Sequence, residues 1–271
     1  MQLRQVFITF LALICAGQAL AQQAPVPPTL AAKSWLLLET SSGQILTTEK
    51  PDERIEPASL TKLMTAYLTF SALRQKTIAI DQSLPVSQKA WKTGGSKMFV
   101  RVDTQVPVDD LIKGMIVQSG NDACVTLAEG IAGSEENFAQ MMNREAQRLG
   151  MKSSSFTNST GLPDPQLYTT ARDLSILANA LIRDFPEDYK KYYSIKEFRY
   201  NNITQPNRNR LLFIDPTVDG VKEGWAPNQS ATSRTRPCDP CPGIRCGHGS
   251  QTHRHCDRRF NDRVSWRDRF A

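Results

Sequence analysis

Strand-like segments stand at both ends of a long helical block, and this order limits the possible folds more than any other feature of the sequence. Residues 34–39 and 44–48 are apolar runs on either side of a Thr-Ser-Ser-Gly turn, which is typical of a hairpin. Residues 196–222 become strand-like again and end in the run 217–222. Strands from both chain ends around a helical block predict an α+β fold, with one antiparallel sheet packed against the helices.

The first helix is predicted to begin at Ser59, directly after a Pro-Ala pair. Its apolar residues recur every three or four positions and form one stripe, which consists of Leu60, Leu63, Met64, Tyr67 and Leu68. Ser59 and Lys62 lie outside this stripe, and their spacing puts them one turn apart on the same face. We therefore expect the helix to present a hydroxyl and an amine side by side.

Further helical patterns follow between residues 109 and 150. The first two patterns are separated by the short break Ser119-Gly120-Asn121. The third is predicted to begin after the N-cap residue Ser134 and to end at Gly150, since serine suits the start of a helix and glycine its left-handed end. The sequence thus predicts a polar break in the middle of the helical block.

The first 21 residues have the pattern of a secretory signal peptide. Arg4 supplies the basic start, residues 6–16 the apolar segment, and residues 19–21 a small-x-small cleavage site. A membrane anchor is the weaker interpretation, because the apolar run is shorter than the roughly 20 residues that span a bilayer. We expect a signal peptide over 1–21 and a Pro-rich linker over 22–33.

Residues 225–271 differ from the rest of the chain in composition. They contain nine Arg and four Asp but no Lys or Glu, and so carry five of the six formal positive charges. Four cysteines and all three histidines also lie there: Cys238, Cys241, Cys246, Cys256, His248, His253 and His255. The body keeps only Cys124 after signal removal, so no disulfide is expected within it. We expect one folded domain over 34–224 and a basic tail that does not fold with it.

Ser59 and Lys62 can form a nucleophile with its own base. A serine hydroxyl attacks a carbonyl group when a base takes its proton, and an amine one turn away can do so if burial lowers its pKa. The Ser-x-x-Lys pattern alone is common, and a capping serine beside a solvated lysine is its ordinary interpretation. Here Ser119-Gly120-Asn121 and Lys222-Glu223-Gly224 follow it in order. Elements of these three kinds are the joint signature of penicillin-binding proteins and class A β-lactamases.

Residues 30–224 resemble the low-molecular-mass penicillin-binding proteins of the D-alanyl-D-alanine carboxypeptidase family. The likeness includes segments beyond the three motifs, namely residues 56–67, 118–123, 160–162, 168–174, 207–209 and 219–222. It implies a periplasmic serine enzyme that removes the terminal D-alanine from peptidoglycan pentapeptide and that β-lactams acylate. It implies no cofactor, no metal and no nucleic-acid partner, and allows a membrane surface as a partner of intact family members.

The resemblance also implies roles for the first two motifs. Ser59 would form the acyl-enzyme with the penultimate D-alanine, and Lys62 would act as its base. Ser119 and Asn121 would pass protons and orient the peptide.

The resemblance assigns the substrate's terminal carboxylate to Lys222 and Gly224. It places the oxyanion between the backbone N–H of Ser59 and one from the strand after Gly224. The family usually has a threonine where this chain has Glu223. Like charges ~4 Å apart repel by about 1 kcal/mol in water and by more in a dry cleft, so Glu223 is expected to weaken carboxylate binding.

The tail departs from the family as well, since the family continues with two more strands and a closing helix. Residues 225–271 show no such pattern, so the final strands are expected to be missing or replaced. We interpret the change as a shift of reading frame near residue 223. Two other interpretations stay open: a metal-binding tail, although its Cys and His spacing fits no closed zinc site, and a basic tail for an anionic polymer.

Two other functions compete with the carboxypeptidase. A class A β-lactamase needs a deacylating glutamate in the loop before the next helix, and residues 158–166 contain none. That helix is predicted to begin at Thr170, with Asp173 completing a capping box. A non-catalytic remnant that binds penicillin or muropeptides would lack a reactive Ser59, so labelling with a β-lactam distinguishes it.

Overall fold

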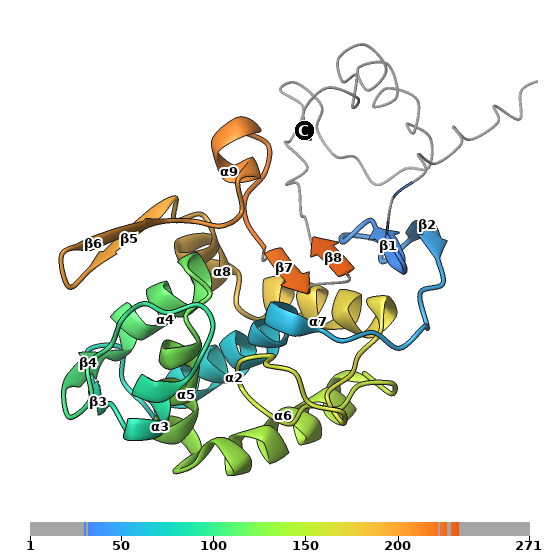
Figure 1. Cartoon of the computed structure of the whole chain (residues 1–271). Coiled ribbons are helices and arrows are strands. Elements are labelled where there is room, and N and C mark those ends of the chain that lie inside the picture. The colour runs from blue at the N-terminus through green and yellow to red at the C-terminus, as the bar shows by residue number, and fades with distance from the viewer. Residues whose placement is uncertain (1–29, 31, 222, 227–228, 233–271) are drawn as a thin grey trace, which may run out of the picture. The chain divides into compact units, whose positions relative to one another are not determined.

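The computed structural model of the chain describes residues 30, 32–221, 223–226 and 229–232. The predicted signal peptide lies outside the described residues, as do Lys222 and the clustered cysteines and histidines of the tail. Figure 1 shows the described elements, with the helices gathered together and the strands in short pairs.

The helical elements of the described chain begin with a 3-10 turn. In order they are η1 (Ala58–Thr61), α2 (Lys62–Arg74), α3 (Gln88–Lys92), α4 (Val108–Val117), α5 (Asn121–Ala132), α6 (Glu135–Leu149), α7 (Ala171–Asp184), α8 (Pro186–Tyr193) and α9 (Leu211–Ile214).

The described strands pair only in antiparallel twos. The pairs are β1 (Trp35–Leu38) with β2 (Ile45–Glu49), β3 (Ser83–Pro85) with β4 (Gln105–Pro107), β5 (Glu197–Tyr200) with β6 (Ile203–Pro206), and β7 (Glu223–Ala226) with β8 (Gln229–Thr232). In the last pair Glu223 lies opposite Thr232 and Ala226 opposite Gln229.

The predicted α+β class is confirmed, but one feature of the expected sheet differs. Among the described residues, the first and last hairpins are separate pairs and do not join into one sheet. β1 packs against α7, whereas β7 lies beside η1. Each strand pairs with the next strand along the chain, across a short loop in three pairs and across a segment that contains α3 in the pair of β3 and β4.

Helix α2 lies in the middle of the helical block. It contacts α4, α5, α6 and α7, which surround it in Figure 1. The predicted apolar stripe is buried, but so is the rest of the first two and a half turns, from Lys62 to Phe70. Because neighbours cover every side, the amine of Lys62 is carried into the interior as well.

The predicted ends of α6 and the predicted start of α7 are confirmed, and nearby side chains and backbone groups determine them. Ser134 accepts a hydrogen bond from a backbone N–H in the first turn of α6, and Gly150 ends that helix at φ +87°. Thr170 caps α7 in the same way, through the N–H of Asp173. The capping box is incomplete, since the Asp173 carboxylate accepts from the backbone N–H of Ser153, 2.8 Å away.

Residues 216–217 form a turn and residues 218–221 have no regular secondary structure, so the strand predicted over 217–222 is wrong for residues 217–221. The Asp215 carboxylate accepts hydrogen bonds from the backbone N–H and the hydroxyl of Thr217, at 2.9 and 2.6 Å. Such a side-chain turn competes with strand backbone. The strand begins at Glu223 instead, so the third motif lies at a strand start.

The described strands also continue past residue 224. β7 ends at Ala226, and β8 extends to Thr232. This differs from the expectation that strand-forming sequence stops near 224. The boundary proposed there between domain and tail stays a prediction.

Candidate active site

Ser59 stands in η1, the turn that leads directly into α2. Ala58 before it has φ +45°, a left-handed conformation that residues with a Cβ rarely adopt. The turn is closed by a hydrogen bond from the N–H of Leu60 to the carbonyl of Pro57, at 3.0 Å. The half-buried Ser59 therefore precedes Lys62 by one turn, and Lys62 Nζ lies 3.4 Å from Ser59 Oγ.

The amine of Lys62 is buried, with a relative exposure of 1%. It donates to the carbonyl oxygen of Thr160 at 2.5 Å. Burial lowers the pKa of Lys62 from its ordinary value, and the charge of Arg208 acts in the same direction. Cys124 and Asp122 act in the opposite direction. A lowered pKa makes the neutral amine available, and a neutral amine can serve as a general base.

The second motif lies between α4 and α5, as predicted. Ser119 has φ +61°, and its buried hydroxyl has no hydrogen-bond partner among the described residues. Asn121 begins α5 and donates from its side-chain amide to the carbonyl of Gly94, at 2.7 Å. Its backbone N–H donates to the carbonyl of Ser96, also at 2.7 Å. The motif is thus tied to the loop that contains Gly94 and Ser96.

Asp122 reinforces this connection, and the sequence analysis gave it no role. Its buried carboxylate accepts from the backbone N–H groups of Met98, Phe99 and Val100, at 2.9, 2.9 and 3.1 Å. An acidic residue in the first turn of a helix is a recognisable signal. Its partners lie more than 20 positions away, so the sequence does not reveal them.

The loop after α6 contains Thr160, whose carbonyl accepts from the Lys62 amine, and hydrogen bonds within the loop fix its conformation. The side-chain oxygen of Asn158 accepts from the backbone N–H groups of Thr160 and Gly161, at 3.2 and 2.7 Å. Gly161 has φ +83°, and a Cβ built there would lie 1.7 Å from the carbonyl oxygen of Ala58. Only glycine allows this approach between the loop and the turn that carries Ser59.

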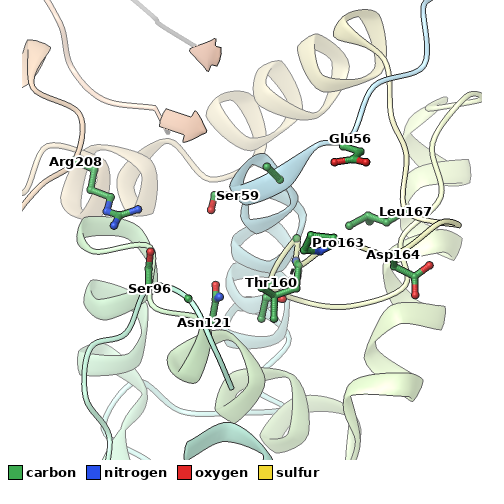
Figure 2. A pocket seen from close by; sticks show the side chains of 13 residues that line it. Glu56, Ser59, Ser96, Asn121, Thr160, Pro163, Asp164, Leu167 and Arg208 are labelled. Carbon is green, nitrogen blue, oxygen red and sulfur yellow. Dashed lines mark hydrogen bonds between the residues drawn. The ribbon is translucent and has the colours of Figure 1, made fainter. Parts of the chain in front are cut away.

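A cavity of about 510 Å³ opens at Ser59. Asn121, Thr160 and Gly161 contribute to its lining, and Figure 2 shows the side chains of Ser59 and Asn121 facing the same space. A substrate in this cavity would therefore meet residues of both the first and the second motif.

The two sides of the cavity differ in charge. In Figure 2, Glu56 and Asp164 lie on one side, and Arg208 and Ser96 lie on the other, with Ser59 between them. None of these four flanking residues was predicted as a site residue. Arg208 belongs to a segment that carried the family resemblance, but no motif rule assigned it a function.

The third motif is described only in part, because Lys222 lies outside the described residues. Gly224 belongs to β7, whose backbone lies beside η1. The side-chain amide of Asn209 holds the segment before β7 through the carbonyls of Gly220 and Val221, at 3.0 and 3.4 Å. The strand that carries Gly224 and the turn that carries Ser59 are therefore neighbours.

A helical block with short strand pairs, and a Ser-x-x-Lys pair with a buried lysine that opens into a cavity, define the class of penicillin-binding proteins and related β-lactamases. A model of the family described as D-alanyl-D-alanine carboxypeptidase matches residues 21–232. The chain belongs to this family.

Curated relatives agree with this assignment. The chain is 43% identical over 222 residues to D-alanyl-D-alanine carboxypeptidase DacC of Escherichia coli K12, which covers 79% of this chain and 55% of the relative. It is 47% identical over 203 residues to DacA of Haemophilus influenzae, covering 73% of this chain and 51% of the relative. The chain thus spans about half the length of the curated relatives it matches.

Solved structures share the fold. Penicillin binding protein 5 of Haemophilus influenzae superposes with a TM-score of 0.72 at 45% identity, covering 75% of this chain and 60% of that one. The D-alanyl-D-alanine carboxypeptidase DacD of Francisella tularensis gives a TM-score of 0.78 at 31% identity, with 83% and 67% covered.

Proposed function

We propose that this chain is a serine-type D-Ala-D-Ala carboxypeptidase, which removes the terminal D-alanine from peptidoglycan pentapeptide through an acyl-enzyme on Ser59. The observation that carries the proposal is the 3.4 Å contact between Ser59 Oγ and the buried amine of Lys62, at the cavity. Family membership supports the choice of substrate.

In the first step, neutral Lys62 takes the proton of Ser59 as Oγ attacks the carbonyl carbon of the penultimate D-alanine. The carbonyl oxygen becomes an oxyanion. The backbone N–H of Ser59 and one from the strand after Gly224 stabilise it, because donors fixed in advance interact most strongly with the developing charge.

In the second step, the bond between the carbonyl carbon and the leaving nitrogen breaks. The nitrogen gains a proton, which Lys62 returns by way of the Ser119 hydroxyl, and D-alanine leaves. Asn121 orients the peptide during this transfer. Water then attacks the ester carbonyl carbon and gives up a proton to the same base. The bond from that carbon to Ser59 Oγ breaks, Oγ takes the proton back from Lys62, and the shortened peptide leaves with a new terminal carboxyl group.

The terminal carboxylate of the peptide lies toward the positive side of the cavity in this proposal. Lys222 and Gly224 hold it, and Arg208 contributes further positive charge. Glu223 opposes this binding, since a carboxylate next to a carboxylate is repelled. The presence of Glu223 favours a second candidate function, that of a remnant that binds penicillin or muropeptides without turnover.

The partners and location belong to the same proposal. The penicillin-binding protein D2 of Listeria monocytogenes, 26% identical with a TM-score of 0.67, is described in an ampicillin-bound form. We infer that β-lactams acylate Ser59 here too. The predicted signal peptide over 1–21 would take the chain to the periplasm, where it would act in cell-wall organisation and cell shape. In the described part of the chain, no helix is both long and apolar enough to cross a membrane.

Two assays on the purified chain test the proposal. A fluorescent penicillin should label the wild type, and a peptide ending in D-Ala-D-Ala should release D-alanine at a rate that Ser59→Ala abolishes. Labelling without release would show a reactive Ser59 but contradict carboxypeptidase turnover, and the absence of labelling would favour the binding remnant. Rapid loss of the label, with hydrolysed penicillin in solution, would favour a β-lactamase, and the absence of both labelling and release would contradict the proposal.

A further inference from the structure

The carbonyl oxygen of Thr160 fixes the position of the Lys62 amine. It accepts from Lys62 Nζ at 2.5 Å, while Ser59 lies 3.4 Å from the same nitrogen. Both Thr160 and Lys62 are buried, so water does not replace this acceptor readily. The direction in which the amine points therefore depends on what holds Thr160.

Ser159, directly before Thr160, is held on three sides. Its carbonyl accepts from the hydroxyl of Thr65 in α2, at 2.7 Å. Its backbone N–H and its hydroxyl both donate to one carboxylate oxygen of Glu135, at 3.0 and 2.7 Å. Glu135 is thus the acidic group that anchors the peptide unit beside the Lys62 acceptor.

Glu135 lies 24 positions before Ser159 in the sequence, and its own contacts hold it in place. It is the first residue of α6, and its side chain is only 10% exposed. The other carboxylate oxygen pairs with Lys89 of α3 at 3.0 Å. A buried carboxylate with one cation and two donors is well satisfied, so it can hold Ser159 rigidly.

We propose that Glu135 is a positioning residue for the general base: it fixes Ser159, and through it the Thr160 carbonyl that orients Lys62 toward Ser59. The inference rests on the proposed acylation of Ser59. Glu135 does not touch the reacting atoms, and it lies outside the three motifs.

The rate of proton transfer depends on the geometry at the Lys62 amine. General-base catalysis requires the nitrogen to meet the serine proton in a narrow range of distances and directions. Without Glu135, the N–H and the hydroxyl of Ser159 lose their buried acceptor, and the loop must move to find another. The Thr160 carbonyl moves with it, and displacements of about 1 Å in catalytic groups can cost ~10²-fold in rate.

The neighbouring glutamate provides a matched control. Glu136 is the second residue of α6 and also pairs with Lys89, at 2.7 Å, but its side chain is 72% exposed. None of the hydrogen bonds found in the described residues joins it to Ser159. Glu136→Gln therefore removes the same charge from the same helix turn and from the same lysine, without changing the contact to Ser159.

Acylation of the full-length chain by a fluorescent penicillin is measured in three variants. Glu135→Ala should acylate Ser59 at least about 10-fold more slowly than the wild type. Glu135→Gln keeps an oxygen that can accept from Ser159, so it should stay within about 3-fold, as should Glu136→Gln. Equal rates in Glu135→Ala and the wild type would overturn the proposal. An equal loss in Glu136→Gln would overturn it too, because the effect would then belong to the charge near Lys89.

The pH profile separates positioning from general damage. The groups that bear on Lys62 are Arg208, Cys124 and Asp122, and all three are retained in every variant. The bond to Thr160 favours the charged ammonium, so weakening it should move the acid limb of the acylation profile to lower pH. A chain that is merely less folded would label less at every pH, with the limb unmoved, and that result would contradict the proposal.

A second readout does not depend on acylation. Lysine labelled with ¹³C at the ε-carbon reports the titration of Lys62 by NMR, with Lys62→Met giving the assignment. Glu135→Ala should lower the pKa of Lys62 relative to wild type and Glu136→Gln, even if the chain turns over no substrate. If Glu135→Ala does not fold, Ser159→Ala replaces it, since it removes one of the two donors to Glu135. An unchanged Lys62 titration in the folded variant would refute the inference.

Discussion

The buried amine of Lys62 carries a cost to folding that depends on pH. Its pKa lies below the ordinary 10.5 in the folded chain, because burial disfavours the ammonium form. Below the folded pKa, the chain must bury a charged amine and the full cost applies. Above 10.5, folded and unfolded chains both hold the neutral amine, and the cost disappears. The free energy of unfolding therefore increases as the pH rises from the folded pKa of Lys62 to 10.5.

Lys62→Met tests this linkage, since methionine cannot titrate. The free energy of unfolding of the variant, relative to wild type, should be most favourable below the folded pKa of Lys62 and should decline as the pH rises from there to 10.5. Chemical denaturation at several pH values measures the difference. A difference that stays constant over this range would mean that Lys62 is not desolvated.

Gly161 is the second residue whose substitution should strongly affect the chain. A Cβ there would meet the backbone oxygen of Ala58 at 1.7 Å, and φ is +83°. Gly161→Ala should destabilise the chain by about 2 kcal/mol or more and slow the labelling of Ser59. The control is Gly150→Ala, where φ is +87° but nothing lies within 4 Å of the added Cβ.

The control separates backbone strain from displacement of the site. Gly150→Ala should cost about 1 kcal/mol, from the left-handed conformation alone, and leave acylation unchanged. Equal effects of the two substitutions on acylation would show that the contact between Gly161 and Ala58 does not position Ser59.

Helix ends could be predicted from the sequence because their chemistry is local. Ser134 and Gly150 act within one turn of themselves, so the pattern contains all that decides the outcome. The strand predicted over 217–222 failed because the Asp215 side chain closes a turn there. The Ser59–Lys62 contact was predictable from helical spacing, whereas Asp122 and its distant partners were not, because only the packed fold brings them together.

Asp122 links α5 to the loop over 94–100, and removing its carboxylate should lower the free energy of unfolding. Asp122→Ala leaves three backbone N–H groups without their acceptor, and each such group costs about 1–3 kcal/mol when buried. We expect a loss of at least about 3 kcal/mol in urea denaturation. Asp122→Asn keeps one carbonyl oxygen as acceptor, so its loss should be smaller. Equal losses in the two variants would contradict the assigned contacts.

The end of the domain at residue 224 stays a prediction. The family match continues to residue 232, eight residues beyond the predicted domain end. The resemblance rested on segments of the body that end at residue 222, so it was not extended to residues 225–232. The frame change, the metal-binding tail and the polymer-binding tail all concern residues that the structure does not describe, so these interpretations stay predictions.

Glu223 stands where the resemblance to the family leads us to expect a threonine, and replacing it tests the effect. Glu223→Thr should raise kcat/KM for a D-Ala-D-Ala peptide by about 10-fold, because removing a repulsion of about 1.4 kcal/mol has that effect. Glu197→Thr, the same change on exposed strand β5, should leave kcat/KM unchanged. An unchanged rate in Glu223→Thr would show that this carboxylate does not face the substrate.

The proposed mechanism requires an acyl-enzyme at Ser59 with Lys62 as its base. The direct measurement is mass spectrometry of the intact chain and its digest after timed exposure to a penicillin, for wild type, Ser59→Ala and Lys62→Ala. We predict one adduct on the peptide that contains Ser59, none in Ser59→Ala, and at least ~10²-fold slower formation in Lys62→Ala. An adduct on another residue, or an unchanged rate in Lys62→Ala, would contradict the account.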